Sequence, residues 1–161
     1  KSLKISSEMH RLYPNNAFFH RFVARNSFAL GKLTDAERYA KELLKNLDEG
    51  RYGYGANDGR YGAYILAYIN HHRYNNLNLA KEYYAKSMYY ALDNDSKKTG
   101  YYASSNLALG KIAILEKNYK AGIAYLGDAM KNSDKNSTTY NDANTELKEL
   151  TKMLKTAKRK K

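Results

Sequence analysis

Apolar and polar positions alternate with a helical period along most of this chain. Apolar residues recur three and four positions apart, the spacing that places them on one face of an α-helix. Only one proline and ten glycines interrupt the pattern, which favours helices over strands. The pattern predicts about eight helices, at residues 2–13, 16–30, 35–47, 61–72, 79–92, 101–116, 119–131 and 138–158.

Local signals support several of these boundaries. Pro14 disfavours helix at the residue before it, and Gly31 suits the left-handed conformation that follows a helix. Thr34 and Glu37 have the spacing of a capping box, which predicts the start of the third helix. Residues 48–60, the most glycine-rich segment, are expected to form a loop.

The last predicted helix carries a single narrow apolar stripe on an otherwise polar surface. The stripe consists of Tyr140, Ala143, Leu147, Leu150 and Leu154. A helix with such a stripe covers the exposed end of a core or a groove. The same stripe is also compatible with a homo-oligomer formed through the C-terminal helix.

Three helix pairs share one internal spacing of twelve residues between their crossing positions. These positions are Ala24 and Ala36, Tyr68 and Ala80, and Gly110 and Gly122. In each pair the first residue lies in mid-helix and the second opens the partner helix. Small side chains are needed where two helix axes approach closely. The most regular copy is the segment 105–129.

This repeated hairpin resembles the tetratricopeptide repeat family, whose unit is a helix–turn–helix of about 34 residues. In the best copy, Leu109 and Gly110 match the family's Leu-Gly pair, Tyr119 its turn aromatic and Ala129 its late small residue. The copies follow one another at longer distances than in the family, with extra residues in the connections 48–60 and 93–100. The resemblance implies an all-α fold, an α–α superhelix of stacked antiparallel hairpins.

We expect a single domain over residues 1–158, followed by a basic tail at 159–161. Within it we expect a half-unit at 1–14, repeat units at about 15–47, 61–93 and 101–132, and a capping helix at 138–158.

Composition limits the possible classes of function. Of the 161 residues 43% are hydrophobic, which excludes wholesale disorder, and the absence of cysteine excludes disulfides and thiolate metal sites. The net charge of +12 is concentrated in the last ten residues, which contribute six positive charges. No apolar run approaches the roughly 20 residues that span a bilayer. The chain starts at Lys1 without a methionine, so we expect a trimmed piece, and the compartment is unknown.

The sequence favours a non-enzymatic function without cofactor or metal. The four histidines are His10, His20, His71 and His72, and their spacing contains no HExxH-like motif. We expect them to be exposed or hydrogen-bonded. The glycine-rich segment lacks a preceding strand and a following Gly-Lys-Ser, so a phosphate cradle is not expected.

The family resemblance implies a concave groove lined by the first helix of each unit. The positions expected there are Phe18, Arg21, Arg25, Ile65, Ile69, His72, Ser104, Leu107 and Lys111. This mixture is apolar with basic edges, which suits a protein or peptide ligand that carries acidic and apolar residues. The first hypothesis is therefore a protein-binding scaffold.

Nucleic-acid binding is the alternative hypothesis. Arg51, Tyr52, Tyr54 and Arg60 combine aromatic rings with positive charge in the loop 48–60, as surfaces that stack bases do. The basic C-terminal tail would add contacts to phosphates.

Overall fold

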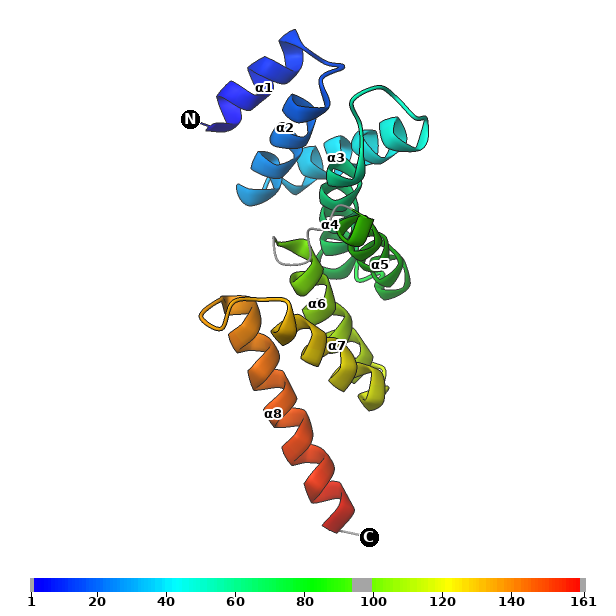
Figure 1. Ribbon diagram of the computed structural model, residues 1–161, viewed down its shortest axis with the longest axis vertical. Helices are drawn as coiled ribbons and strands as arrows, with labels where there is room; N and C mark the ends of the chain where they lie inside the picture. The colour runs from blue at the N-terminus through cyan, green and yellow to red at the C-terminus, as the bar shows by residue number, and fades with distance from the viewer. Residues whose placement is uncertain (1, 94–99, 160–161) are drawn as a thin grey trace. The chain divides into compact units, whose positions relative to one another are not determined.

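The computed structural model describes residues 2–93 and 100–159, and every regular element in this part is an α-helix (Figure 1). The helices are α1 (Ser2–Leu12), α2 (Ala17–Ala29), α3 (Leu33–Asp48), α4 (Ala56–His72), α5 (Leu77–Asp93), α6 (Tyr101–Leu115), α7 (Tyr119–Lys131) and α8 (Thr138–Arg159). The predicted all-α class with about eight helices is confirmed. None of the described helices is long and apolar enough to cross a membrane.

The loop predicted at 48–60 is shorter than expected, because α4 begins at Ala56. The carboxylate of Asp58, the third residue of the helix, accepts a hydrogen bond from the backbone N–H of Gly55 at 2.9 Å. This bond satisfies one of the free donors at the helix start. Gly59 lies inside the helix, and a Cβ at this position would come within 2.5 Å of the Tyr90 ring. Close packing, and not loop formation, explains this glycine.

The predicted capping box at the start of α3 is wrong. The helix begins at Leu33, so Thr34 and Glu37 lie inside it. Both side chains bond to residues just after α4: the Thr34 hydroxyl accepts from Arg73 at 3.1 Å, and Glu37 accepts from the Tyr74 hydroxyl at 2.6 Å. Tertiary partners have replaced the local cap.

The described chain forms two compact units, Lys1–Asp95 (unit 1) and Ser96–Lys161 (unit 2). Most of the predicted connection 93–100 lies outside the described residues, as do the last two residues of the predicted basic tail, Lys160 and Lys161.

In unit 1, consecutive helices from α1 to α5 pack against one another, and α2 also contacts α4. The main core cluster is built by α2, α3 and α4 from small and branched side chains. Its members are Ala24, Ala36, Ala40, Leu43, Leu44, Ala63, Ile65, Leu66 and Ile69. Because α2 and α4 share this core, their outward-facing side chains are neighbours.

In unit 2, α6 and α7 form the hairpin with the most regular repeat pattern, and the predicted close approach of Gly110 and Gly122 is confirmed. A Cβ at Gly110 would come within 2.9 Å of Leu126, and one at Gly122 within 3.0 Å of Ile114. Helix α8 packs against α7 and α6, and its Ala143 joins Leu126 in a buried cluster.

The Gly110 contact predicts a position-dependent response to valine. Gly110→Val should lower the free energy of unfolding by about 2 kcal/mol, because added methyl groups overpack the buried Leu126. Gly127→Val is the matched control in the same hairpin, where no atom lies within 4 Å of the added Cβ. Denaturant unfolding followed by circular dichroism measures both, and equal effects would contradict the close approach.

Candidate functional site

Side chains of α2 and of the first turns of α4 enclose a pocket in unit 1. Its lining residues, called the basic pocket from here on, are Phe18, Arg21, Phe22, Arg25, Asn57, Arg60 and Tyr61. The α2 members are three and four residues apart and so share one helical face, and the α4 members share another. The cavity volume is about 370 Å³.

A buried carboxylate connects the two helices beneath the pocket. Arg21 donates from Nη1 to Oδ1 of Asp58 at 2.8 Å, and the Asp58 side chain is only 2% exposed. The second oxygen, Oδ2, accepts from the backbone N–H of Gly55 at 2.9 Å. A buried charge is tolerated when it is paired and hydrogen-bonded, as it is here. Asp58 thus fixes both the start of α4 and the position of Arg21.

The basic pocket carries more positive than negative charge. Arg60 is buried, donates to Asn57 Oδ1 at 3.0 Å and lies over the Tyr61 ring, with 4.8 Å between its guanidinium carbon and the ring centroid. Arg25 is exposed, and no acidic group in residues 2–93 or 100–159 forms an ion pair with it. The lining thus contains three arginines, of which Arg21 is paired with Asp58 and Arg25 is exposed. The exposed Arg25 favours an anionic ligand.

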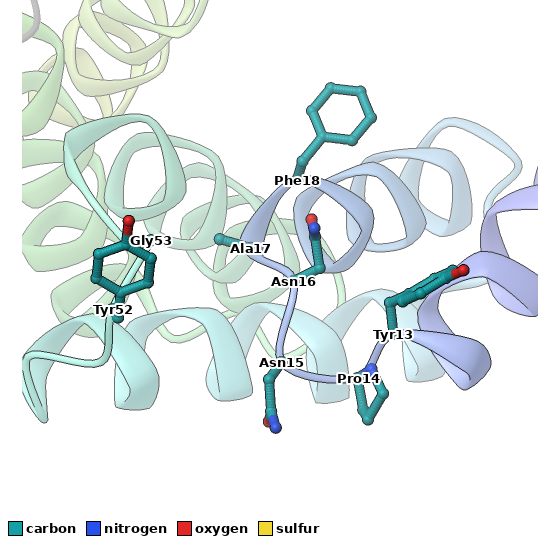
Figure 2. Close-up of a pocket in the computed structure, with 8 residues that line it drawn as sticks. All are labelled: Tyr13, Pro14, Asn15, Asn16, Ala17, Phe18, Tyr52 and Gly53. Atoms are coloured by element: carbon teal, nitrogen blue, oxygen red, sulfur yellow. The ribbon is translucent and has the colours of Figure 1, made fainter.

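An aromatic surface adjoins the basic pocket. It lies between the α1–α2 turn and the α3–α4 loop, and its lining residues, called the aromatic rim, are Tyr13, Pro14, Asn15, Asn16, Ala17, Phe18, Tyr52 and Gly53. Figure 2 shows Phe18 projecting from the first turn of α2, with Tyr13 and Tyr52 to either side of it in the view. These three side chains are 57%, 56% and 100% exposed, respectively.

Phe18 belongs to both the basic pocket and the aromatic rim. Its ring stacks on Phe22 with 6.0 Å between centroids, and the Arg21 guanidinium lies 5.8 Å from its centroid. Aromatic rings next to cations contribute both apolar contact area and cation–π attraction. The two features form one continuous surface, which we call the α2–α4 surface.

Three of the groove residues predicted from the sequence, Phe18, Arg21 and Arg25, do come together on this surface. Ile65 and Ile69 do not, because both are fully buried in the core of unit 1. The prediction that they line an open groove is therefore wrong. The partly exposed face of α4 carries Tyr64 and Tyr68, each one residue before a predicted groove position.

The partly exposed face of α4 is lined by tyrosines. Tyr64 and Tyr68 are half-buried, and both rings contact Phe28 edge-on. His72 is exposed and its ring lies 4.3 Å from that of Tyr68. At a rise of about 1.5 Å per residue, His72 lies roughly 17 Å along α4 from Tyr61, so it is not part of the basic pocket.

The predicted groove residues of unit 2 are largely occupied by helix packing. Leu107 packs against the cluster formed by α7 and α8. Lys111 forms an ion pair with Glu146 of α8, with 3.4 Å between Nζ and Oε1. Ser104 is half-buried. Leu107 and Lys111 are therefore partly exposed and partly engaged by helix packing, and their place in a groove stays a prediction.

The residues of the nucleic-acid hypothesis do not form one exposed cluster. Tyr52 is fully exposed, whereas Tyr54 packs against the core. Arg60 is buried within α4, and Arg51 pairs with the neighbouring Glu49 at 2.9 Å.

Sequence reasoning missed Asn57 and Arg60 as helical members of the basic pocket because it placed both in the loop 48–60. The usable signal was Asp58, an acidic residue three positions after Gly55, which is the spacing at which a carboxylate caps a helix start. With α4 beginning at Ala56, Asn57, Arg60 and Tyr61 fall on one face.

The Asp58 ion pair predicts a large effect of its removal on stability. Asp58→Ala should lower the free energy of unfolding of unit 1 by about 2 to 4 kcal/mol, because it leaves a partly buried Arg21 unpaired. Asp35→Ala, which removes an exposed partner 3.8 Å from Arg38, should cost less than about 1 kcal/mol. Denaturant titration of both variants makes the comparison, and similar losses would exclude a special role for Asp58.

Comparisons of the chain with protein-family models, with curated proteins and with solved structures found no match. The resemblance to the tetratricopeptide repeat family therefore stays a prediction from residue patterns.

Proposed function

We propose that this chain is a non-catalytic scaffold that binds an acidic and apolar segment of a partner protein on the α2–α4 surface. The observation that carries this proposal is the juxtaposition of a basic pocket having three arginines with a rim of exposed aromatic rings. Acidic side chains of the ligand would enter the pocket, and its apolar or aromatic side chains would lie against the rim.

The arginines are suited to this role by geometry and by preorganisation. A guanidinium presents a planar set of donors that matches a carboxylate, and such charge-assisted bonds are stronger than neutral ones. Arg21 is held by Asp58 and Arg60 by Asn57, so little side-chain entropy is lost when a ligand binds. Arg25 is exposed and supplies the contact that a ligand reaches first.

The aromatic rim would supply most of the apolar contact area. Phe18 and Tyr13 are more than half exposed, and large aromatic side chains dominate the energetics of protein interfaces. A monomeric surface seldom exposes several such rings together unless they contact a partner.

The lining residues favour binding over catalysis. The basic pocket offers arginines, an asparagine and aromatic rings, and Asp58, the carboxylate that pairs with Arg21, is buried. General acid–base chemistry needs a group that exchanges a proton near neutral pH, and arginine does not.

We further propose that the helices of unit 1 follow a tetratricopeptide-like arrangement. In that arrangement the first helices of successive hairpins are neighbours and line the binding face. The contact between α2 and α4 supports this proposal. The additional residues between repeats are accommodated at the α3–α4 connection.

Selection from a displayed library of 12-residue peptides tests the function. We expect enrichment of Asp or Glu next to Phe, Tyr or Leu. For a selected peptide, Arg25→Glu should weaken binding at least about tenfold, as loss of one charge-assisted contact predicts. Lys45→Glu on α3 is the control charge reversal, since Lys45 is also exposed but lines neither the basic pocket nor the aromatic rim, and it should have little effect.

Two outcomes would contradict the proposal. One is equal affinity of the selected peptide for the wild type and the Arg25→Glu variant. The other is preferential binding of a single-stranded oligonucleotide with an affinity that falls steeply with salt, which would favour the nucleic-acid hypothesis.

A further inference from the structure

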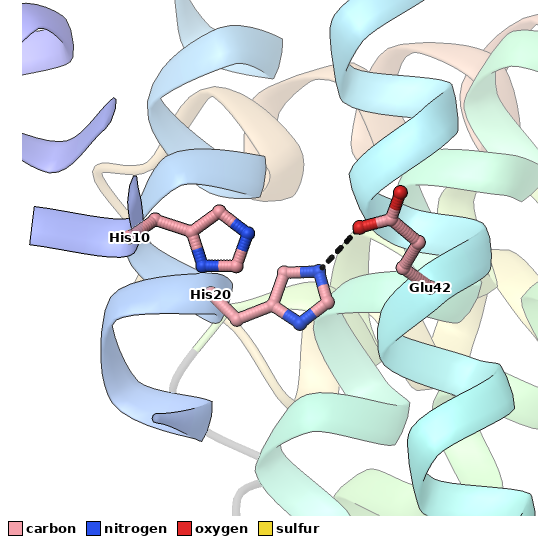
Figure 3. A group of neighbouring side chains, drawn as sticks. All are labelled: His10, His20 and Glu42. Atoms are coloured by element: carbon pink, nitrogen blue, oxygen red, sulfur yellow. Dashed lines mark ion pairs between the residues drawn. The ribbon is translucent and has the colours of Figure 1, made fainter. Parts of the chain in front are cut away.

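Three potential metal ligands from three different helices meet in unit 1, away from the basic pocket. They are His10 of α1, His20 of α2 and Glu42 of α3, and Figure 3 shows the two imidazole rings and the carboxylate converging. One ligand atom of each lies within 4.8 Å of the others. The His10 and His20 rings stack with 4.7 Å between their centroids.

Polar atoms in this cluster are buried without a hydrogen-bond partner. The His20 side chain is only 1% exposed, and neither its Nε2 nor Nδ1 of His10 has a partner among the described residues. Oε2 of Glu42 lies 3.5 Å from Nε2 of His20. A buried polar atom without a hydrogen-bond partner is destabilising, so these nitrogens favour a ligand.

Burial disfavours the charged form of both imidazole rings. Burial, together with the neighbouring His10, lowers the pKa of His20 to about 4, and burial also lowers the pKa of His10. Neutral imidazole has a free lone pair on one nitrogen, and that lone pair is the metal-binding group. At neutral pH the contact between His20 and Glu42 is therefore not an ion pair.

Neighbouring side chains are placed as outer-sphere partners would be. The hydroxyl of Tyr54 lies 3.1 Å from Nδ1 of His20, the ring nitrogen opposite the cluster. Such contacts orient the ring and fix which nitrogen binds the metal. Arg38 lies 3.7 Å from Oε1 of Glu42, which leaves Oε2 directed at His20. The positive charge of Arg38, next to Glu42, opposes the binding of a cation.

We propose that His10, His20 and Glu42 bind a divalent transition-metal ion of the Zn²⁺ type. Two imidazoles and one carboxylate are a typical ligand set for zinc, with water at the fourth position. Metal–ligand distances of about 2.1 Å place the ligand atoms of a tetrahedral site roughly 3.4 Å apart. The 3.5 Å separation of His20 and Glu42 already meets this requirement.

Coordination by His10 requires a shift of α1 and a turn of the His10 ring, which now stacks on His20. The separations of up to 4.8 Å have to close by up to about 1.4 Å for ideal coordination. Among the described helices, the backbone of α1 packs only against α2, so its position is adjustable. A bound ion would fasten α1 to α2 and α3. It would also fix Tyr13, which directly follows α1 and belongs to the aromatic rim.

Calorimetric titration of the untagged, chelator-treated chain with Zn²⁺ tests the proposal. One ion per chain should bind, and saturating Zn²⁺ should raise the midpoint of thermal unfolding through preferential binding to the folded state. Co²⁺ should give the absorption bands of tetrahedral coordination. Glu42→Gln and His10→Gln should each weaken Zn²⁺ binding at least about tenfold, since even outer-sphere changes cost that much.

His72→Gln is the matched control, because His72 is an exposed histidine on α4 outside the cluster. Its Zn²⁺ affinity should equal that of the wild type. Glu42 and His10 are not fully buried, so their variants should keep the far-ultraviolet circular dichroism of the parent. The proposal is overturned if Zn²⁺ shows no saturable binding, or if folded Glu42→Gln and His10→Gln variants bind it as tightly as the His72→Gln control.

Discussion

The buried carboxylate of Asp58 is the constraint on which the candidate site depends. One oxygen caps the start of α4 and the other accepts from Arg21 of α2, so a single side chain sets both the helix boundary and the position of an arginine. A carboxylate that is 2% exposed needs this pairing, since an isolated buried charge is far too costly. Arg25, the exposed arginine of the basic pocket, forms no ion pair among the described residues and is open to an anionic ligand.

The proposed binding surface and the proposed metal site lie on different sides of the same helix. Phe18, Arg21 and Arg25 of α2 contribute to the α2–α4 surface, whereas His20 is buried between α1 and α3. The α1–α2 turn connects the two, because Tyr13 follows the helix that carries His10. Metal binding would therefore act on the aromatic rim by restraining α1, and the basic pocket would be formed without it.

Helical periodicity was sufficient to predict the fold class, and most helix ends lie within two residues of their expected positions. The close approach of Gly110 and Gly122 was also predictable, because the repeated spacing places small residues where the two helices cross. The start of α4 was not predictable, because its glycines resemble a loop in the sequence. Gly59 packs against Tyr90 of α5, and Gly55 bonds to Asp58 within the first turn. Ile65 and Ile69 were misplaced for a different reason. A shift of one residue separates a core position from a surface position on α4, and periodicity alone does not resolve that shift. The meeting of His10, His20 and Glu42 depends on the packing of three helices and has no local signature.

A nuclear magnetic resonance titration of the isotope-labelled chain with an acidic, aromatic peptide tests binding at the α2–α4 surface most directly. Binding there predicts that chemical-shift changes concentrate at Phe18, Arg21 and Arg25 of α2 and at Asn57 to Tyr61 of α4, while the amides of α8 stay unchanged. Saturable changes centred on α8, or on Arg51 and Tyr52 without α2, would contradict it.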